Sequence, residues 1–336
     1  MKEYQIQEND SGQRLDRFLQ KVLPQLPKNL FYKWIRTKHI KVNRKRCKPD
    51  QHLFSGDRVV LYVSDSYFDS DVQQTTEDKF KSYEFLQAPN ELTILFENTQ
   101  ILIVCKPVGL VVHCDNRQVP DTLIHRILYY LYDTGAYNPA QELSFTPALC
   151  NRLDRNTGGI VIAAKTAAAL REVNRLIREN RIQKTYLCTV VGTPPKLADT
   201  PYAWHKKSDT HNTVTICDEK SPGFQEIITG YHVLAKNAIH SLLSVHLITG
   251  RTHQIRAHLA HIGVPILGDN KYGNGKENRR SHCKYQQLWA YQLTLETNAG
   301  TCLADLNGLT IRTALPTFVQ KEFPQFQLAA NELDLD

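Results

Sequence analysis

The chain has 336 residues, of which 41% are hydrophobic and 22% charged, and its formal net charge is +7. This length favours two domains over one, and the composition is that of a globular protein with a buried core. The apolar runs are too short to cross a membrane, and the acidic first ten residues argue against a secretory signal or a basic transit peptide.

The positive charge is concentrated near the N-terminus. The first 63 residues hold 14 Lys and Arg against 6 Asp and Glu, so the rest of the chain carries a net charge of −1. Basic residues gathered in one small module are what binding to a phosphate backbone requires. A solvated surface is the plainer interpretation of a charge run, but here the basic residues lie among predicted helices and strands rather than in a tail.

This N-terminal module, residues 1–63, is predicted to be helical first and then stranded. Apolar residues at helical spacing indicate a helix within 13–22, which Pro24 and Pro27 end. The patterns that follow predict a helix from near Asn29, a strand at 40–43, a basic turn at 44–46 and a strand at 58–62.

The order of four blocks in this module, 14–19, 32–36, 40–43 and 56–59, resembles the S4 RNA-binding domain. The resemblance implies a small α/β module whose basic side chains contact RNA. The candidates for these contacts are Arg17, Lys33, Arg36, Lys38, Lys41, Arg44, Lys45 and Arg46.

A second domain is predicted over 91–328, after a polar and acidic linker at 64–90 and before a C-terminal tail at 329–336. Its apolar runs predict strands at 92–96, 101–105, 160–164, 184–192 and 242–247. Thr166 is predicted to cap a helix between two of them. Because regular βαβ units are absent, we expect the α+β class.

The eight cysteines are scattered without a CxxC pair, and several fall within apolar strand-like runs. Buried free thiols fit this pattern better than disulfides or a zinc site. The sequence therefore predicts a reducing cytoplasm as the location.

Asp154 lies in a polar loop, 151–159, that leads into a very apolar strand. An Asp at such a junction can be held at the edge of a cleft, partly shielded from water. Arg152 and Arg155 beside it favour its ionised form if either lies close in space. Taken alone, such a string is more typical of a surface salt-bridge cluster.

Tyr186 opens the strand that begins near Lys184. Its ring can stack on a base and its phenol can transfer a proton. A strand tyrosine that packs on the core is the commoner case.

The segment 247–258 combines a turn and a helix start. Gly250 permits a tight turn, and Thr252 is predicted to cap a helix of about three turns that Gly263 ends. A helix start beside Arg251 is a natural place for a phosphate.

Arg256 lies near the second turn of this helix, where it can meet a carboxylate from the neighbouring loop. Three histidines close by, His253, His258 and His261, suggest a metal site. The pattern is not HExxH, however, and no carboxylate accompanies the histidines at ligand spacing. We therefore expect no metal, and structural or RNA contacts for these side chains.

Together and in this order, these segments resemble the RluA family of pseudouridine synthases. The matching blocks are 106–113, 151–159, 184–186, 250–258 and 268–273, and the resemblance covers about 92–328. Asn151 stands where the family usually has His, and Gly158 where it usually has Ser. The resemblance implies a domain built on a mixed, mainly antiparallel sheet that isomerises uridine to pseudouridine in structured RNA.

The same resemblance implies roles for single residues. Asp154 acts at C1′ of the ribose, an ion pair with Arg256 keeps it ionised, and Tyr186 stacks on the uracil or serves as a base. The uridine must be flipped out of a stem, and Arg152 takes its place. The remaining substrate-binding candidates are Arg155, Thr157, Lys184, Arg251, His253, Gln254 and Ile255. Because the product is an isomer, we expect no cofactor.

The target RNA stays open at this point. The S4-plus-synthase arrangement resembles bacterial enzymes that act on large-subunit ribosomal RNA, so 23S rRNA is the expected partner and tRNA the alternative. A non-catalytic RNA-binding ribosome-assembly factor is a second alternative. The family default is a monomer without a membrane partner. Covalent attack on C1′ and elimination from C2′ both fit the residues.

Overall fold

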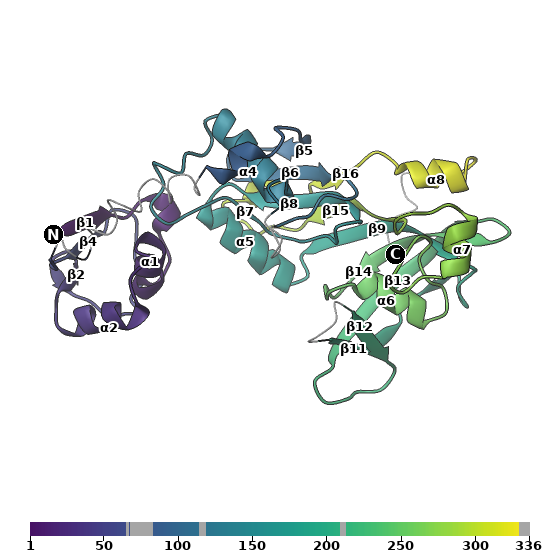
Figure 1. The fold of residues 1–336 in the computed structure, drawn as a ribbon, viewed down its shortest axis with the longest axis horizontal. Helices are drawn as coiled ribbons and strands as arrows, with labels where there is room; N and C mark the ends of the chain where they lie inside the picture. Colours follow the sequence, from purple (N-terminus) through teal and green to yellow (C-terminus); the bar gives the residue numbers. More distant parts are fainter. Residues whose placement is uncertain (65–66, 68–82, 114–118, 209–212, 329–336) are drawn as a thin grey trace.

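The computed structural model describes residues 1–64, 67, 83–113, 119–208 and 213–328 (Figure 1). Most of the predicted linker, 65–66 and 68–82, lies outside these residues, as does the predicted tail, 329–336. The described chain forms a small N-terminal module and a larger body around a long sheet. None of the described helices combines the length and the hydropathy needed to span a membrane.

The N-terminal module packs two helices against a four-stranded antiparallel sheet with the order β1-β4-β2-β3. Its elements are β1 (Lys2–Gln5), a 3-10 helix (Glu8–Asp10), α1 (Leu15–Val22), α2 (Lys28–Arg36), β2 (Ile40–Val42), β3 (Lys45–Arg46) and β4 (Arg58–Leu61). The helices and strands expected here are present, and β1 is an addition that the sequence pattern did not indicate. The predicted turn at 44–46 is wrong in part, because Lys45 and Arg46 form the short strand β3. Asn43 and Arg44, with φ of 51° and 64°, make the tight turn between β2 and β3.

Each helix of the module buries one apolar stripe. Phe18 on α1 and Phe31 on α2 are 0% and 1% exposed and belong to one core cluster with residues of the sheet. Basic residues on the same two helices, such as Arg17 on α1 and Lys33 on α2, are exposed. Helical periodicity thus separates the core from a basic surface.

The larger body is built on a twelve-stranded sheet, whose path runs β12-β11-β13-β14-β9-β15-β8-β6-β5. The strands are β5 (Thr93–Glu97), β6 (Ile101–Lys106), β7 (Ala148–Leu149), β8 (Gly158–Ala164), β9 (Ile182–Val191), β10 (Ala198–Asp199), β11 (Tyr202–Lys207), β12 (Val214–Cys217), β13 (Gln225–Lys236), β14 (His240–Leu247), β15 (Leu288–Leu295) and β16 (Thr310–Arg312). β15 and β8 pair in parallel, and the other pairings among the described strands are antiparallel. The expected α+β class with a mixed, mainly antiparallel sheet is confirmed.

Helices cover both faces of the sheet (Figure 1). The helices of this body are α4 (Leu123–Asp133), α5 (Ala167–Arg178), α6 (Gln254–His261), α7 (Gly275–Arg280) and α8 (Thr317–Glu322). Alternate residues of β6 face different cores: Leu102 packs in the cluster that holds α4, and Ile103 in the cluster that holds α5. Thr166 caps α5 as expected, because its side chain accepts from the N–H of Ala169 at 3.1 Å.

The end of the predicted linker belongs to the larger body. Residues Glu84–Gln87 form a 3-10 helix, and Phe85 is 3% exposed in the core that α4 lines. Its ring lies 5.8 Å from that of Tyr132. The polar composition of this stretch concealed one aromatic anchor, and a single buried ring is enough to dock a short segment.

The module and the body meet through polar contacts that α5 and the segment before β7 make with residues 9–11. Asn9 donates to Glu142 at 3.0 Å, and Ser144 donates to Asp10 at 2.5 Å. Arg171 on α5 donates to the backbone of the 3-10 helix segment at 3.0 Å. Asp10 is 0% exposed, so a fully buried carboxylate sits at this junction.

Candidate active site

Asp154 lies in the loop between β7 and β8, and β8 fixes the position of this loop. All seven residues of β8 are buried. The side chain of Asn151 extends this order into the loop, because its Nδ2 donates to Ile160 O (3.2 Å) and its Oδ1 accepts from Ile162 N (2.8 Å). The N–H of Thr157 donates to the carbonyl of Asp154 (3.0 Å) and closes the turn that carries the carboxylate.

A buried lysine joins this loop to the end of β6. Lys106 is 0% exposed, and its Nζ donates to the carbonyl oxygens of Pro107 (2.9 Å), Leu110 (2.8 Å) and Arg155 (3.0 Å). Burial lowers the pKa of Lys106 to about 8, and the negative charge of Asp154 opposes part of this shift. One ammonium group therefore holds two loops together next to the carboxylate.

Helix α6 begins later than predicted, and Thr252 is not its cap. The N-cap is His253, which is in the left-handed conformation (φ 52°) and makes no side-chain cap bond. The turn before the helix is organised by Gln254 instead: its amide accepts from Arg251 N at 3.0 Å and donates to the backbone of β13 at 3.0 Å. Gln254 was expected to bind the RNA substrate. Because its amide is used in these bonds, we conclude that Gln254 holds the turn in place instead.

Arg256 on α6 lies between two carboxylates. Its Nη1 donates to Asp154 Oδ2 at 2.6 Å, while its Nε and Nη2 make a bidentate pair with Asp269 at 2.7 and 2.9 Å. Burial lowers the pKa of Arg256, but the hydrogen bonds and charges of the two carboxylates outweigh it and raise the pKa above its ordinary value. The expected meeting of Arg256 with the loop carboxylate is thus present.

Tyr186 on β9 is 6% exposed and lines a hollow of about 80 Å³ beside Asp154. Leu247, Ile255 and Leu288 complete its apolar wall. Burial, with the nearby charge of Asp154, raises the pKa of Tyr186, so its phenol stays protonated at neutral pH. An apolar slot closed by a neutral phenol suits a flat, uncharged ring.

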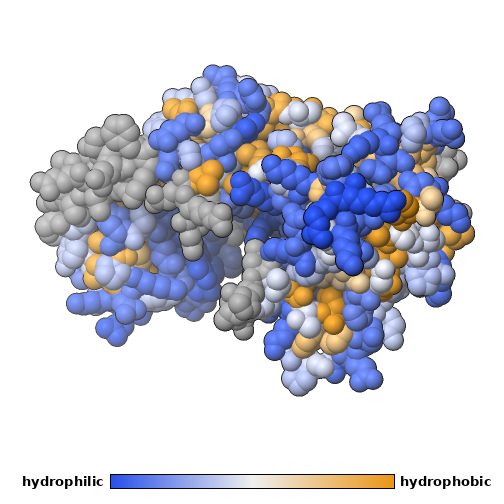
Figure 2. Space-filling model, turned by 45° about the vertical axis from the view of Figure 1, so that its right-hand side comes forward, coloured by the Kyte–Doolittle hydropathy of each residue, from blue (hydrophilic) through white to orange (hydrophobic). Residues whose placement is uncertain are grey.

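A wider cleft of about 540 Å³ adjoins this hollow, and its rim is basic. The rim includes Arg152, Arg155, Lys207 and Lys271. Arg155 donates to a backbone carbonyl at 3.1 Å rather than to Asp154, and Arg152 makes no hydrogen bond or ion pair within the described chain. Neither flanking arginine is therefore the partner of Asp154. The protein surface in Figure 2 is mostly hydrophilic, with apolar patches in between.

The other substrate-binding candidates fall into three groups. Arg251 and Ile255 line the smaller hollow. Thr157 lines it too, but it is 2% exposed and its hydroxyl accepts from Gln286 at 3.3 Å. Lys184 lines neither hollow, and burial lowers its pKa.

The three histidines of the helix segment face three different partners. His253 Nδ1 lies 2.9 Å from Tyr272 Oη, His258 Nδ1 lies 3.0 Å from a threonine hydroxyl of β13, and His261 Nε2 lies 2.8 Å from Asp218. Within the described ranges no group of three or more His, Cys, Asp or Glu side chains is arranged to hold a metal ion.

Sequence reasoning missed Lys106, Asp269 and Tyr272, although the blocks 106–113 and 268–273 contain them. A lysine at the end of an unbroken apolar strand is one signal of a buried cation. For Asp269 and Tyr272 the spacing offers no such signal, because their partners come from α6.

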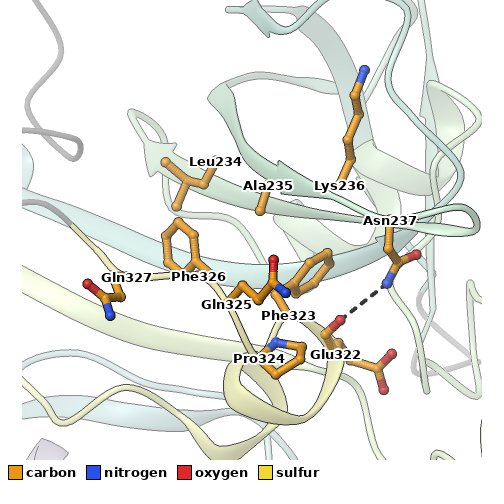
Figure 3. A pocket seen from close by; sticks show the side chains of 10 residues that line it. All are labelled: Leu234, Ala235, Lys236, Asn237, Glu322, Phe323, Pro324, Gln325, Phe326 and Gln327. Carbon is orange, nitrogen blue, oxygen red and sulfur yellow. Dashed lines mark hydrogen bonds between the residues drawn. The ribbon is translucent and has the colours of Figure 1, made fainter.

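A second large hollow, of about 550 Å³, lies between the end of β13 and α8 (Figure 3). Phe323, Phe326 and Leu234 line it, and Asn237 donates to the carbonyl of Glu322 at 3.3 Å. It shares no lining residue with the Asp154 cleft and lacks a carboxylate–arginine pair. Size alone therefore does not distinguish the two hollows, and the charged pair makes the Asp154 cleft the candidate active site.

Comparison with known proteins agrees with this geometry. Residues 100–261 match the RNA pseudouridylate synthase family model, and residues 13–59 match the S4 domain model. An uncharacterised RNA pseudouridine synthase of Mycoplasma genitalium is 30% identical over 322 residues, which cover 92% of this chain and 95% of the relative. Ribosomal large subunit pseudouridine synthase C of Buchnera aphidicola is 34% identical over 271 residues, 80% of this chain and 79% of the relative.

A further relative, ribosomal large subunit pseudouridine synthase D of Escherichia coli, is 29% identical over 271 residues, 80% of this chain and 75% of the relative. Among solved structures, human RNA pseudouridylate synthase domain containing 4 matches with a TM-score of 0.54 at 22% identity, covering 73% of this chain and 94% of the human chain. That likeness supports the fold.

Fold and site thus define an RNA-modifying isomerase with an S4 module in front. The chain belongs to the RNA pseudouridine synthases, and within them to the RluA type. The expected family and enzymatic activity are confirmed, and the non-catalytic assembly factor is set aside.

Proposed function

We propose that this enzyme isomerises uridines of 23S ribosomal RNA to pseudouridine, with Asp154 acting at C1′. The observation that carries the assignment of Asp154 is its pairing with the buried Arg256 at the floor of a basic cleft. The relatives named as ribosomal large subunit pseudouridine synthases C and D support the choice of RNA.

The remaining roles follow from position. The slot beside Tyr186 takes the uracil and keeps the detached ring from escaping. Arg152, exposed and without a protein partner in the described chain, takes the place of the flipped base. Arg155, Arg251 and Lys207 are placed to contact the neighbouring phosphates.

The N-terminal module would hold a second part of the RNA. Arg36, Arg46 and Lys48 line a hollow of about 480 Å³ between α2 and β3. All eight basic candidates of this module lack a carboxylate partner within the described chain; Lys41 alone is half-buried, with its Nζ 5.0 Å from the ring centre of Tyr62. Basic side chains without carboxylate partners, gathered in one module, are the electrostatic footprint of phosphate binding.

We further propose that the enzyme acts as a monomer in a reducing compartment such as the cytoplasm. One chain supplies every charged group of the site, from the Asp154 loop to α6. The seven cysteines of the described chain are free, which fits a reducing location.

Tritium release tests the activity and the substrate. RNA transcribed with tritium at uridine C5 loses that label when C5 joins the sugar. We expect release from 23S rRNA transcripts exceeding that from tRNA transcripts, and a loss of more than about 10³-fold in Asp154→Asn. Asp218→Asn, whose side chain is 83% exposed, is the matched control and should keep full activity.

Release from tRNA alone would overturn the choice of 23S rRNA while leaving the chemistry intact. Full activity of Asp154→Asn would overturn the assignment of the carboxylate.

A further inference from the structure

The two oxygens of the Asp154 carboxylate have different surroundings. Oδ2 accepts from Arg256 Nη1 at 2.6 Å. Oδ1 makes no hydrogen bond within the described chain, and His253 Nε2 lies 3.8 Å away, beyond hydrogen-bond distance. Oδ1 is therefore the oxygen left for the substrate, and an imidazole nitrogen stands beside it.

The proton position on His253 is fixed by Tyr272. The Tyr272 hydroxyl oxygen accepts from the backbone N–H of Val214 at 2.9 Å and lies 2.9 Å from His253 Nδ1. These are its two partners within the described chain, so the hydroxyl hydrogen points to His253. Nδ1 then accepts, and the ring proton of a neutral imidazole is on Nε2, next to Asp154.

The imidazole is neutral and held in place. Burial lowers the pKa of His253 to about 4, although the charge of Asp154 opposes part of the shift. Its side chain is 6% exposed, and its ring packs edge-on against Tyr272 at 5.7 Å. The backbone of His253 is left-handed (φ 52°), a conformation that histidine adopts at a cost and that functional sites retain.

We propose that His253 is a catalytic residue, resting on Asp154 as the group at C1′: its Nε2–H donates to uracil O2 while the C1′–N1 bond breaks. The bond's electron pair moves to N1 and spreads over C2 to O2, so negative charge develops on an oxygen two bonds from N1. A fixed neutral N–H beside Asp154 Oδ1 stabilises that charge without giving up its proton.

The same donor serves the second half of the reaction. Turning uracil about its N3–C6 axis brings C5 to the place of N1 and O4 to the place of O2. His253 Nε2–H then donates to O4 while an electron pair of C5 forms the bond to C1′, which Asp154 releases. The C5–H bond then breaks, and its proton passes to solvent, where the tritium assay counts it. Because uracil carries its two oxygens symmetrically about this axis, one donor can hold the ring before and after rotation.

Two substitutions separate this role from a structural one. In His253→Gln the amide nitrogen replaces Nε2, whereas in His253→Asn the shorter amide reaches only the place of Nδ1. We expect His253→Asn to lower the single-turnover rate of tritium release about 10²-fold with unchanged RNA affinity, and His253→Gln to stay within about 10-fold. A backbone role predicts the opposite order, since Asn tolerates the left-handed conformation better than Gln.

Replacing uracil O2 by sulfur tests the proposed contact between His253 Nε2–H and O2. Transcripts made with 2-thiouridine carry a poor acceptor in place of O2. The wild-type enzyme should slow on them, and His253→Asn should show little further loss. Equal slowing of both proteins would overturn the contact with O2.

A third measurement needs no RNA, so it stands even if 23S rRNA is the wrong substrate. Nitrogen NMR of the ring of His253 should show the Nε2–H tautomer in the wild-type protein and a mixture in Tyr272→Phe. A proton on Nδ1 in the wild-type protein would overturn the inference.

Discussion

Arg256 makes more hydrogen bonds with the carboxylate of Asp269 than with that of Asp154. Asp269 is 1% exposed and takes two N–H groups, while the side chain of Asp154 is 27% exposed and takes one. Asp269 also accepts from the N–H groups of Lys271 and Tyr272, at 2.8 and 3.1 Å. The buried carboxylate therefore fixes the plane of the guanidinium, and the remaining N–H is aimed at Asp154.

Replacing that anchor should affect both stability and activity. Asp269→Asn leaves a buried cation with one carboxylate, so we expect a loss of about 3 kcal/mol in the free energy of unfolding. The rate of tritium release should fall about 10²-fold, since the guanidinium no longer holds its plane. Urea denaturation measures the first and single-turnover release the second. Unchanged stability would mean that Arg256 does not depend on Asp269.

The sequence singled out Asp154, Tyr186 and Arg256 as candidates because each lies in a recognisable block, and the structure brings the three together. It did not find the neutral state of His253 or the anchor Asp269, because both depend on contacts between segments far apart in the chain. Burial and tautomer are set by tertiary packing, which spacing along one segment does not reveal.

At the scale of elements, the position of the Asp154 loop depends on β6 through Lys106. With a pKa lowered to about 8, Lys106 is charged in the folded protein below that pH and bonds three carbonyl oxygens. Above it, the neutral amine has only two hydrogens, and one carbonyl loses its donor. We expect activity to fall as the pH rises through about 8, and Lys106→Met to show low activity without this step.

Stability should change in the opposite direction over that range. Because the folded pKa of Lys106 is lowered from its ordinary value of 10.5, the unfolded chain binds more protons between about pH 8 and 10.5. The contribution of this group to stability therefore rises with pH there. Parallel profiles of activity and melting temperature check the divergence; a melting temperature of Lys106→Met that keeps the full wild-type pH dependence would contradict it.

The parallel pairing of β8 with β15, which places Trp289 beside Gly158, explains one departure from the family pattern. A Cβ on Gly158 would lie 2.1 Å from the ring of Trp289. Gly158→Ser should therefore destabilise the protein by about 2 kcal/mol through overpacking. In Gly158→Ser combined with Trp289→Leu the loss should be smaller than the sum of the single losses. Additive losses in thermal unfolding would contradict a clash between these two residues.

Elements whose sequence signal lies within the element itself were predictable. Helix α5 has its own cap and apolar stripe, and β8 has its own apolar run. The start of α6 was not, because the amide of Gln254 closes the turn that Thr252 was expected to cap. The 3-10 helix at Glu84–Gln87 was hidden in a polar stretch whose one anchor is Phe85.

At the scale of the whole molecule, charge on the N-terminal module should govern affinity rather than chemistry. Arg36→Gln, Arg46→Gln and Lys48→Gln together should weaken RNA binding and reduce the slope of log affinity against log salt by about 2 to 3. The rate at saturating RNA should stay unchanged, because Asp154 is untouched. Binding titrations at several salt concentrations measure the slope.

The matched control removes three exposed lysines from the larger body, namely Lys196, Lys236 and Lys321. None of them lines the Asp154 cleft or the basic hollow of the module. An equal loss of slope in both triple variants would show that net charge, not the module surface, drives binding.

The polar junction of residues 9–11 with Glu142, Ser144 and Arg171 sets how far the module stands from Asp154. Because the module and the Asp154 cleft lie at a set distance from each other, an RNA binds both only if its folded shape spans that distance. We expect an RNA that spans this distance to place its uridine at Asp154 whenever it is bound to the module. We expect an unfolded RNA of the same sequence to bind the module alone, so that its uridines reach the cleft only by chance. We therefore expect target choice to depend on RNA architecture more than on the bases next to the uridine.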